Sequence, residues 1–231
     1  VGKDESFFTT WSGYSGNVIN DDIAGGVGPY DTNLISYTYN GGAFRAGIAL
    51  EQGDDDARVG NVRTGWGIDD YMPHVVVGVG YNAGMVDLSA VVGFDTRDDI
   101  AGATYDVGGW AAKVRADVTI TDQFSVFAIG MYGENSSAYA TWAPYVSSNT
   151  ETWSAIVGGS FKATEKVTFN TQVQWVEGQF AADSDRWSAV ANMNYTVVPG
   201  LVVTPEVVYY DTGVAGTDGQ FGFYGRVQRS F

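Results

Sequence analysis

The residue types that carry out enzyme chemistry are scarce in this sequence. His74 is the only histidine and there are no cysteines, so the chain offers no thiolate nucleophile and too few nitrogen and sulfur ligands for a zinc site. No G-x-S-x-G motif accompanies His74 to supply a serine nucleophile. The glycine-rich stretch GGVGP at residues 25–29 has neither the strand-to-helix context nor the lysine of a phosphate-binding loop. We therefore expect no enzymatic activity, no cofactor and no bound metal.

Charged residues are the remaining candidates for a functional role, and acidic residues outnumber basic ones. The chain has 27 Asp and Glu residues against 12 Lys and Arg residues, a net charge of −15. Nucleic acid is disfavoured as a partner, because phosphate binding needs a basic surface, and an anionic membrane surface is disfavoured for the same reason. We interpret the acidic run at residues 54–56 and the pair Asp98-Asp99 as surface charge in loops, with at most loose binding of divalent cations.

The elements that must position these charges are β-strands. Hydrophobic residues make up 45% of the chain and aromatic residues 14%, with 31 glycines and only 5 prolines, which is typical of many aromatic-rich strands. No run approaches the roughly 18 apolar residues of a membrane helix, and no basic and apolar leader opens the chain. Eleven strands are predicted, at residues 32–39, 42–52, 74–81, 84–95, 107–120, 123–132, 151–163, 166–176, 185–198, 201–211 and 219–231.

The segments between the predicted strands alternate between short and long. The short ones are turns at Asn40-Gly41, Asn82-Ala83, Thr121-Asp122, Thr164-Glu165 and residues 198–200. The long ones are polar loops at residues 53–73, 96–106, 133–150, 177–184 and 212–218. This alternation indicates that each strand pairs with its neighbour in sequence, with turns at one rim and loops at the other. An outer-membrane β-barrel has this arrangement, whereas soluble sandwiches mix their connections by Greek-key crossings.

Each predicted strand carries an apolar face and a polar face. Phe169 and Val173 share one face of their strand, for example, and Asn170 and Gln172 share the other. The apolar faces are rich in alanine and glycine, and aromatic residues lie near strand ends. Both features favour an all-β fold, a transmembrane antiparallel up-and-down β-barrel whose apolar side faces lipid and whose polar side encloses water.

Two sets of residues follow from this orientation. Aromatic girdles at the two lipid interfaces are expected to contain Trp110, Tyr132, Trp153, Phe161, Trp175, Trp187, Tyr195, Tyr209 and Phe231. The basic residues expected on the lumen face are Arg45, Lys113, Arg115, Lys162, Lys166, Arg186 and Arg226. His74 is expected to be structural or pore-lining.

The number of strands also constrains the first 31 residues. Bacterial single-chain barrels have an even number of strands and both termini on the periplasmic side. With a periplasmic C-terminus, the first predicted strand descends from the outer rim, so residues 1–31 are expected to form a loop on the extracellular side, preceded by at least one further strand. Alternatively, residues 5–16 form that strand and give a twelve-stranded barrel, although the glycines of this region are more typical of a loop.

A known family shares specific stretches with this chain. The run SFFTTWSGYSGNVINDDIAGGVGPYDTNLISYTYNGGAFRAGIALEQGDD, residues 6–55, and the terminal GRVQRSF resemble the alphaproteobacterial general porins of the Brucella type. Such porins are sixteen-stranded, trimeric diffusion channels of the outer membrane, in which the third extracellular loop folds into the lumen and narrows it.

The resemblance covers the whole chain and implies a role for each part of the chain. It implies that residues 1–31 are the lumen-constricting loop and that residues 32–231 are strands six to sixteen with their extracellular loops, so that the family's signal and first five strands have no counterpart here. It also implies acidic residues at the constriction, namely Asp4, Glu5, Asp21, Asp22 and Asp31.

We therefore expect a water-filled porin in the outer membrane of a Gram-negative bacterium, through which small hydrophilic solutes and ions diffuse passively. Crossed acidic and basic rows would set a transverse field in the lumen and give a weak preference for cations. The resemblance implies a homotrimer surrounded by lipid and lipopolysaccharide.

Two alternatives are open at this point. A non-conducting structural or adhesive barrel would have a lumen filled with bulky apolar side chains. A smaller, twelve-stranded substrate-specific channel would have a track of aromatic residues along the lumen, for which Tyr37, Tyr39 and Trp66 do not suffice.

Overall fold

The structure, a computed structural model, is almost entirely β. It describes residues 1–54, 58–59, 62–63, 65–98, 107–143, 150–178, 185–214 and 216–231. The strands are β1 (Gly2–Glu5), β2 (Asp31–Gly41), β3 (Phe44–Glu51), β4 (Arg58–Val59), β5 (Val62–Arg63), β6 (His74–Asn82), β7 (Val86–Asp95), β8 (Gly109–Thr121), β9 (Phe124–Glu134), β10 (Glu151–Lys162), β11 (Val167–Val176), β12 (Arg186–Val198), β13 (Leu201–Asp211) and β14 (Gln220–Arg229). The helix α1 (Phe7–Ser12) follows β1. Within the described ranges, no helix has the length and apolar character needed to cross a membrane.

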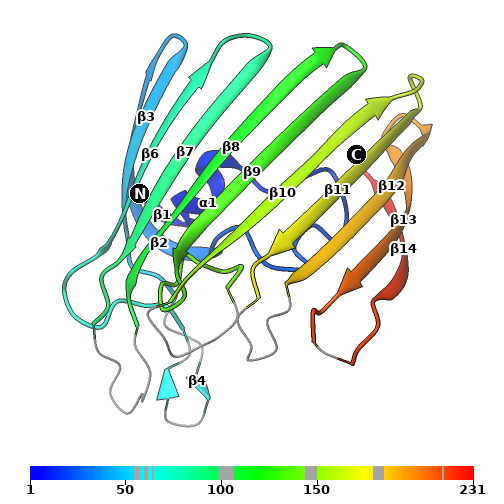
Figure 1. Cartoon of the computed structure of the whole chain (residues 1–231). Helices are drawn as coiled ribbons and strands as arrows, with labels where there is room; N and C mark the ends of the chain where they lie inside the picture. The colour runs from blue at the N-terminus through cyan, green and yellow to red at the C-terminus, as the bar shows by residue number, and fades with distance from the viewer. Residues whose placement is uncertain are drawn as a thin grey trace. The chain divides into compact units, whose positions relative to one another are not determined.

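Twelve strands form one sheet whose order follows the sequence (Figure 1). The order is β1-β2-β3-β6-β7-β8-β9-β10-β11-β12-β13-β14, and β4 and β5 form a separate two-stranded sheet. All eleven predicted strands are present, with ends that differ from the prediction by no more than two residues. The sequence did not predict β1, β4 and β5, because strands of four or two residues are too short to show an alternating pattern.

Some of the short connections depend on glycine. Gly42 in the β2–β3 turn has φ of 69°, and Gly200 in the β12–β13 turn has φ of 80°. Both values lie in the left-handed region, which glycine adopts without steric cost. The predicted turn at Asn40-Gly41 is therefore shifted, since Gly41 still belongs to β2 and the turn itself consists of Gly42 and Ala43.

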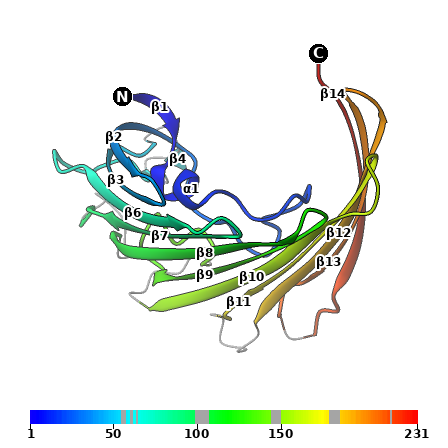
Figure 2. The same cartoon turned by 90° about the horizontal axis from the view of Figure 1, so that it is seen from above.

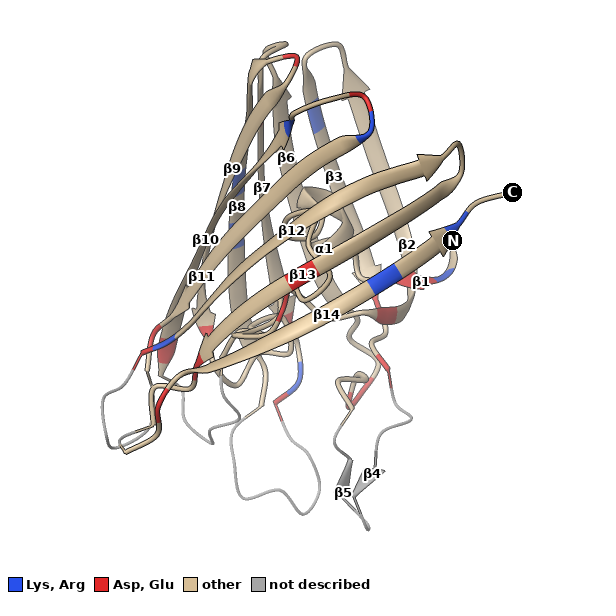
Figure 3. Cartoon of the chain, turned by 90° about the vertical axis from the view of Figure 1, so that its right-hand side faces the viewer, with Lys and Arg blue, Asp and Glu red and all other residues tan. Residues whose placement is uncertain are grey.

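The apolar faces of the strands are exposed, whereas many side chains on the polar faces of β3 and β6 to β13 are buried. Phe161 is 46% exposed and Val173 43%, whereas Gln172 is 1% and Asn192 6% exposed. Figure 3 shows that most charged residues lie at strand ends and in loops. A soluble sandwich has the reverse arrangement, with its apolar faces packed together as the core. The predicted assignment of the two faces is thus present in the structure, with apolar residues exposed and polar residues buried.

The exposed apolar residues are continuous across neighbouring strands. Phe161 of β10 pairs with Phe169 of β11, which pairs with Met193 of β12. Two rows further along the same face, Val157 pairs with Val173. Cross-strand registration therefore collects the apolar residues on one surface and leaves the polar residues on the other.

The chain divides into two compact units. The first contains residues 1–14, 26–115 and 130–153, and the second contains residues 15–25, 116–129 and 154–231. In the first unit α1 contacts β6 and β7, and Figure 2 shows it lying over one face of these strands. In the second unit residues 15–25 are hydrogen-bonded to polar side chains of β11, β12 and β13.

Candidate functional site

Residues 6–30, the inner segment, connect β1 to β2 and begin with α1, where the sequence predicted a loop or a strand. Ser6 caps the helix, since its Oγ accepts a hydrogen bond from the backbone N–H of Phe8 at 3.2 Å. Gly13, with φ of 72°, ends the helix. Six residues are too few for a helical period to stand out in a sequence, so the helix depends on the contacts that hold it.

Glycines on β3 and β6 make room for the aromatic side chains of α1. Gly47 and Gly78 are paired on neighbouring strands. A methyl group at Gly78 would lie 2.5 Å from Nε1 of Trp11, and one at Gly47 would lie 2.6 Å from the ring of Phe7. The indole N–H of Trp11 donates to the carbonyl of Val79 at 3.0 Å. The rings of α1 therefore rest directly on the backbone of the polar strand faces.

Valine in place of Gly78 is expected to displace α1. The larger side chain overlaps the ring of Trp11, and overpacking of this kind costs about 1–3 kcal/mol. We expect the free energy of unfolding, measured with urea and tryptophan fluorescence, to fall by about that amount. Gly225→Val is the matched control, because nothing lies within 4 Å of a methyl group there. Equal losses in the two variants would show that contact with Trp11 is not the cause.

Glu51, at the end of β3, holds the beginning of α1. The carboxylate is 1% exposed and accepts hydrogen bonds from the N–H of Phe7 at 2.6 Å, the Oγ of Ser6 at 2.9 Å and the hydroxyl of Tyr139 at 3.0 Å. A carboxylate is favourable beside the free N–H groups at the start of a helix. Burial, and then the charge of Glu51, raise the pKa of Tyr139 well above its ordinary value, which keeps its hydroxyl protonated as a donor.

Lys113 of β8 holds the other end of α1. Its Nζ donates to the carbonyls of Val27 at 2.8 Å, Thr9 at 3.3 Å and Gly13 at 3.5 Å. Lys113 is completely buried. The alternation of β8 placed Lys113 on the correct face, but the expectation that it lines open lumen is not what the structure shows, because the inner segment covers it.

In the second unit, polar side chains bind the main chain of residues 15–25. The amide of Gln172 accepts from Gly16 N at 2.7 Å and donates to the carbonyl of Asp21 at 2.8 Å. The carboxylate of Glu206, on β13, accepts from the N–H groups of Ile19 at 2.5 Å and Asn20 at 3.0 Å. These side chains are buried on the polar strand faces and satisfy backbone groups of a segment without regular structure.

Comparisons with known proteins identify the family that shares this arrangement. The family model described as "Porin subfamily" matches residues 1–224. The chain belongs to the porin subfamily. Similar curated proteins include Porin Omp2b of Brucella neotomae, 41% identical, and Porin Omp2a of Brucella suis biovar 1 (strain 1330), 40% identical, each over 243 residues. The whole chain aligns with 60% and 58% of these two relatives, so this porin chain spans about 60% of their length.

Solved structures show the same fold. The outer membrane channel DcaP of Acinetobacter baumannii has a TM-score of 0.77 at 20% identity, covering 100% of this chain and 70% of that chain. An anion-selective porin from Comamonas acidovorans has a TM-score of 0.59 at 16% identity, covering 98% of this chain and 61% of that chain. The predicted likeness to Brucella-type porins and the predicted porin fold are confirmed, and the outer membrane is the location that the family indicates.

Three of the five acidic residues predicted for the porin constriction lie on paired strands. Asp4 and Glu5 belong to β1, and Glu5 pairs with Asp31 of β2. Asp31 also forms an ion pair with Lys3 at 3.3 Å. Residues 1–31 are therefore not a loop throughout, because residues 2–5 are a strand of the main sheet. Residues 5–16, the alternative twelfth strand, do not form one strand, because residues 7–12 are α1.

The other two acidic residues, Asp21 and Asp22, belong to the inner segment in the second unit. Asp22 is exposed, and Asp21 is partly buried. Burial, the neighbouring charge of Asp22 and that of Glu206 raise the pKa of Asp21, although a backbone hydrogen bond opposes them. Asp21 therefore loses its charge at a higher pH than an ordinary aspartate.

The acidic loop residues interpreted as surface charge are described only in part. Asp54 is partly exposed and Asp98 is exposed. Asp55, Asp56 and Asp99 lie outside the described residues.

The basic residues predicted for the porin lumen fall into two groups. Arg45, Lys113 and Arg115 contact the inner segment: the guanidinium of Arg45 lies 5.2 Å from the ring centre of Trp11, and that of Arg115 donates to the carbonyl of Tyr14. The others lie beside the β10–β11 turn or on β12 and β14, and they are Lys162, Lys166, Arg186 and Arg226. The sequence gives the face of each residue but not its contact with a segment far away in the chain.

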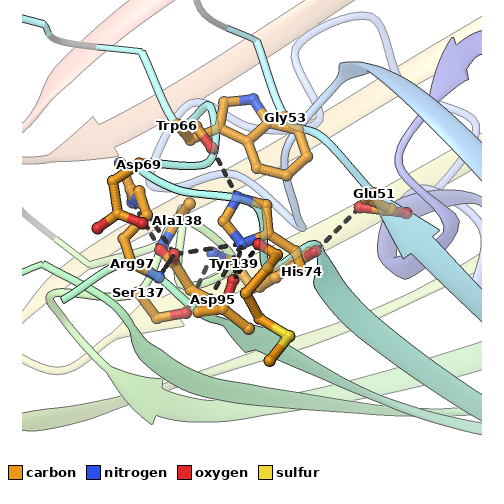
Figure 4. Close-up of polar contacts among 12 residues, drawn as sticks. Glu51, Gly53, Trp66, Asp69, His74, Asp95, Arg97, Ser137, Ala138 and Tyr139 are labelled. Atoms are coloured by element: carbon orange, nitrogen blue, oxygen red, sulfur yellow. Dashed lines mark hydrogen bonds and ion pairs between the residues drawn. The ribbon is translucent and has the colours of Figure 1, made fainter.

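His74 belongs to a buried polar cluster where loops meet the strands (Figure 4). Its Nδ1 accepts a hydrogen bond from Thr96 N at 3.1 Å, so Nε2 carries the proton that is donated to the carbonyl of Trp66 at 2.8 Å. Asp95 receives two hydrogen bonds from the guanidinium of Arg97, at 2.6 and 2.9 Å. These hydrogen bonds join strand ends to loops, which gives His74 a structural role.

Of the nine aromatic residues predicted as girdles, eight lie on the apolar side of their strands near the ends, and Phe231 lies just beyond the end of β14. Those toward the loops are Trp110, Tyr132, Trp153, Trp175, Trp187 and Tyr209, and those toward the turns are Phe161, Tyr195 and Phe231. Neighbouring rings are in contact, with centres 5.7 Å apart for Trp110 and Tyr132 and 4.7 Å apart for Trp187 and Tyr209. Tyr37 and Tyr39 also lie on the exposed apolar side, 69% and 53% exposed, and so form no track along the polar side.

Proposed function

We propose that the protein forms a water-filled channel through the outer membrane for passive diffusion of small hydrophilic solutes and ions. The observation that supports this most strongly is the contrast between the strand faces. The apolar faces are exposed, and polar side chains of β3, β8, β11, β12 and β13 bind the main chain of the inner segment. Strands of this kind enclose a polar space when a barrel closes, and a fixed segment within it narrows the passage.

The inner segment and its neighbours supply charges of both signs to that passage. The exposed carboxylate of Asp22 and the guanidinium groups of Arg45 and Arg115 are the groups best placed to act on solutes. The net charge of −15 favours a weak preference for cations. Acidification should weaken this preference, because Asp21, with its raised pKa, becomes neutral before an ordinary aspartate does.

Further parts of the proposal concern the whole protein. Within residues 1–31 the inner segment acts as the lumen-constricting part, and residues 32–231 act as wall and loops. The C-terminus lies on the periplasmic side, the aromatic residues at strand ends form girdles at the lipid interfaces, and the protein is a homotrimer in contact with lipid and lipopolysaccharide. The protein is a channel and not an enzyme.

Recording from planar bilayers tests the proposed function. Folded full-length protein is expected to insert with stepwise increases in conductance, and a salt gradient is expected to give a reversal potential that shows weak cation preference. Protein unfolded by heat is the control. Folded protein that gives no steps would contradict the channel and favour a non-conducting barrel.

A further inference from the structure

We propose that Lys113 and Glu51 together form a clamp that fixes the position of the constriction, Lys113 being its principal positioning residue. The proposal builds on the channel function above, in which the inner segment narrows the passage. It concerns how that segment is kept in one place.

Lys113 is placed to hold the inner segment and not to act on solutes. The side chain is completely buried, and within the described ranges its hydrogen-bond acceptors are all main-chain carbonyls of the inner segment. The face of the Phe8 ring lies 5.1 Å from the ammonium. A buried ammonium is costly unless it is hydrogen-bonded, so Lys113 and the segment depend on each other.

One ammonium joins both arms of the inner segment to β8. Thr9 and Gly13 lie on the outgoing arm, at the end of α1, whereas Val27 lies on the returning arm. The last carbonyls of a helix lack partners within the helix and interact favourably with a cation. Displacement of either arm therefore breaks a hydrogen bond to a charged group.

Glu51 acts at the opposite end of α1, from a different strand. Its three donors are Ser6 and Phe7 of the inner segment and Tyr139 of the loop after β9, and Figure 4 shows the bond to Tyr139. The same loop holds the returning arm, because Thr141 Oγ1 accepts from Gly28 N at 2.8 Å. Glu51 and Lys113 thus hold the two ends of α1, and displacement of either end breaks a hydrogen bond to one of them.

The first test replaces Lys113 with methionine, which keeps the length of the side chain and removes its charge. In planar bilayers the full-length Lys113→Met protein is expected to switch between conductance levels about tenfold more often than the wild type, since loss of a charged hydrogen bond changes an equilibrium by about that factor. Arg229→Met removes one positive charge from an exposed position on β14 and is expected to behave as the wild type does. Steady wild-type conductance in Lys113→Met would overturn the clamp.

A second measurement does not depend on conduction. Ser12, at the end of α1, is 6% exposed and its hydroxyl makes no hydrogen bond within the described ranges, so Ser12→Cys is a mild probe in a chain without cysteines. A water-soluble thiol reagent is expected to label this cysteine about tenfold faster when Lys113→Met is also present. Equal labelling rates would overturn the clamp even if the channel conducts. Faster labelling in a protein that never conducts would support the clamp and refute the channel.

A disulfide between the inner segment and the loop after β9 is expected to restore the wild-type behaviour of the Lys113→Met protein. A β-carbon at Gly26 would lie 3.1 Å from that of Thr141, close to the roughly 3.5–4.5 Å of a disulfide. Gly26→Cys with Thr141→Cys should, when oxidised, return the Lys113→Met protein to wild-type switching, and reduction should restore the fast switching. If Lys113→Met does not fold, as judged by heat-dependent gel mobility, Glu51→Gln is used for the same measurements. Wild-type behaviour of a folded Glu51→Gln protein would then count against the clamp.

Discussion

Arginine in place of Val157 is expected to destabilise the folded protein by about 2–4 kcal/mol. Val157 is 55% exposed on the apolar side of β10. It lies four residues from Trp153 and four from Phe161, the two aromatic residues proposed to mark the lipid interfaces on this strand. The middle of β10 therefore lies near the centre of the bilayer, where a guanidinium loses its hydration.

Unfolding of the protein in phospholipid vesicles, followed by tryptophan fluorescence in increasing guanidinium chloride, measures this loss. Glu165→Arg introduces the same side chain at an exposed position in the β10–β11 turn and should change the free energy of unfolding by less than about 1 kcal/mol. A Val157→Arg protein as stable as the Glu165→Arg control would mean that this face does not contact hydrocarbon.

Alanine in place of Glu206 is expected to release the inner segment in the second unit and to cost about 3 kcal/mol or more. The carboxylate is 4% exposed and accepts hydrogen bonds from Ile19 N, from Asn20 N and Nδ2, and from Asn192 Nδ2 at 3.0 Å. Removal of the acceptor leaves partly buried donors of Ile19 and Asn20 unpaired, and a buried donor without a partner costs about 1–3 kcal/mol. Local release of the segment limits the total, because freed donors can reach water.

The same unfolding experiment in vesicles measures the free energy of unfolding of Glu206→Ala. Limited proteolysis detects release of the inner segment. Thr204→Ala is the matched control, since Thr204 is buried on the same face of the same strand but donates to Asn194 and not to the inner segment. We expect cleavage within residues 15–25 only in Glu206→Ala. Resistance equal to that of Thr204→Ala would show that Glu206 does not hold the segment.

The strands could be predicted because each contains an alternating pattern of ten or so residues bounded by turn residues. Phe169 and Val173 on one side and Asn170 and Gln172 on the other define both the strand and its faces, and the structure keeps this assignment. Alternation also placed Lys113 and Arg115 on the polar side. The alternating pattern depends only on residues that are neighbours in the sequence, because successive side chains of a strand point to opposite faces.

The contacts that form the site could not be predicted in the same way, because they join residues far apart in the sequence. Glu51 ends a predicted strand next to an acidic loop, and nothing in its surroundings indicates that it holds Ser6 and Phe7, over 40 residues away. In the sequence Gly47 and Gly78 look like any other strand glycines. Only the structure shows that the rings of Phe7 and Trp11 pack against them. The helix α1 exists because of these contacts, so its sequence alone gave no sufficient signal.

Spin labelling along β11 tests most directly whether the apolar faces meet lipid and the polar faces do not. Single cysteines at residues 169 to 174 of the folded protein in lipid vesicles would each carry a nitroxide, and its relaxation by oxygen and by a water-soluble nickel chelate would be measured. Labels at Phe169, Thr171 and Val173 are expected to be relaxed strongly by oxygen and weakly by the chelate. Labels at Asn170, Gln172 and Gln174 are expected to be relaxed more by the chelate than by oxygen, or only slightly by either. Strong chelate accessibility at Phe169 and Val173, with oxygen accessibility at Gln172, would contradict the account.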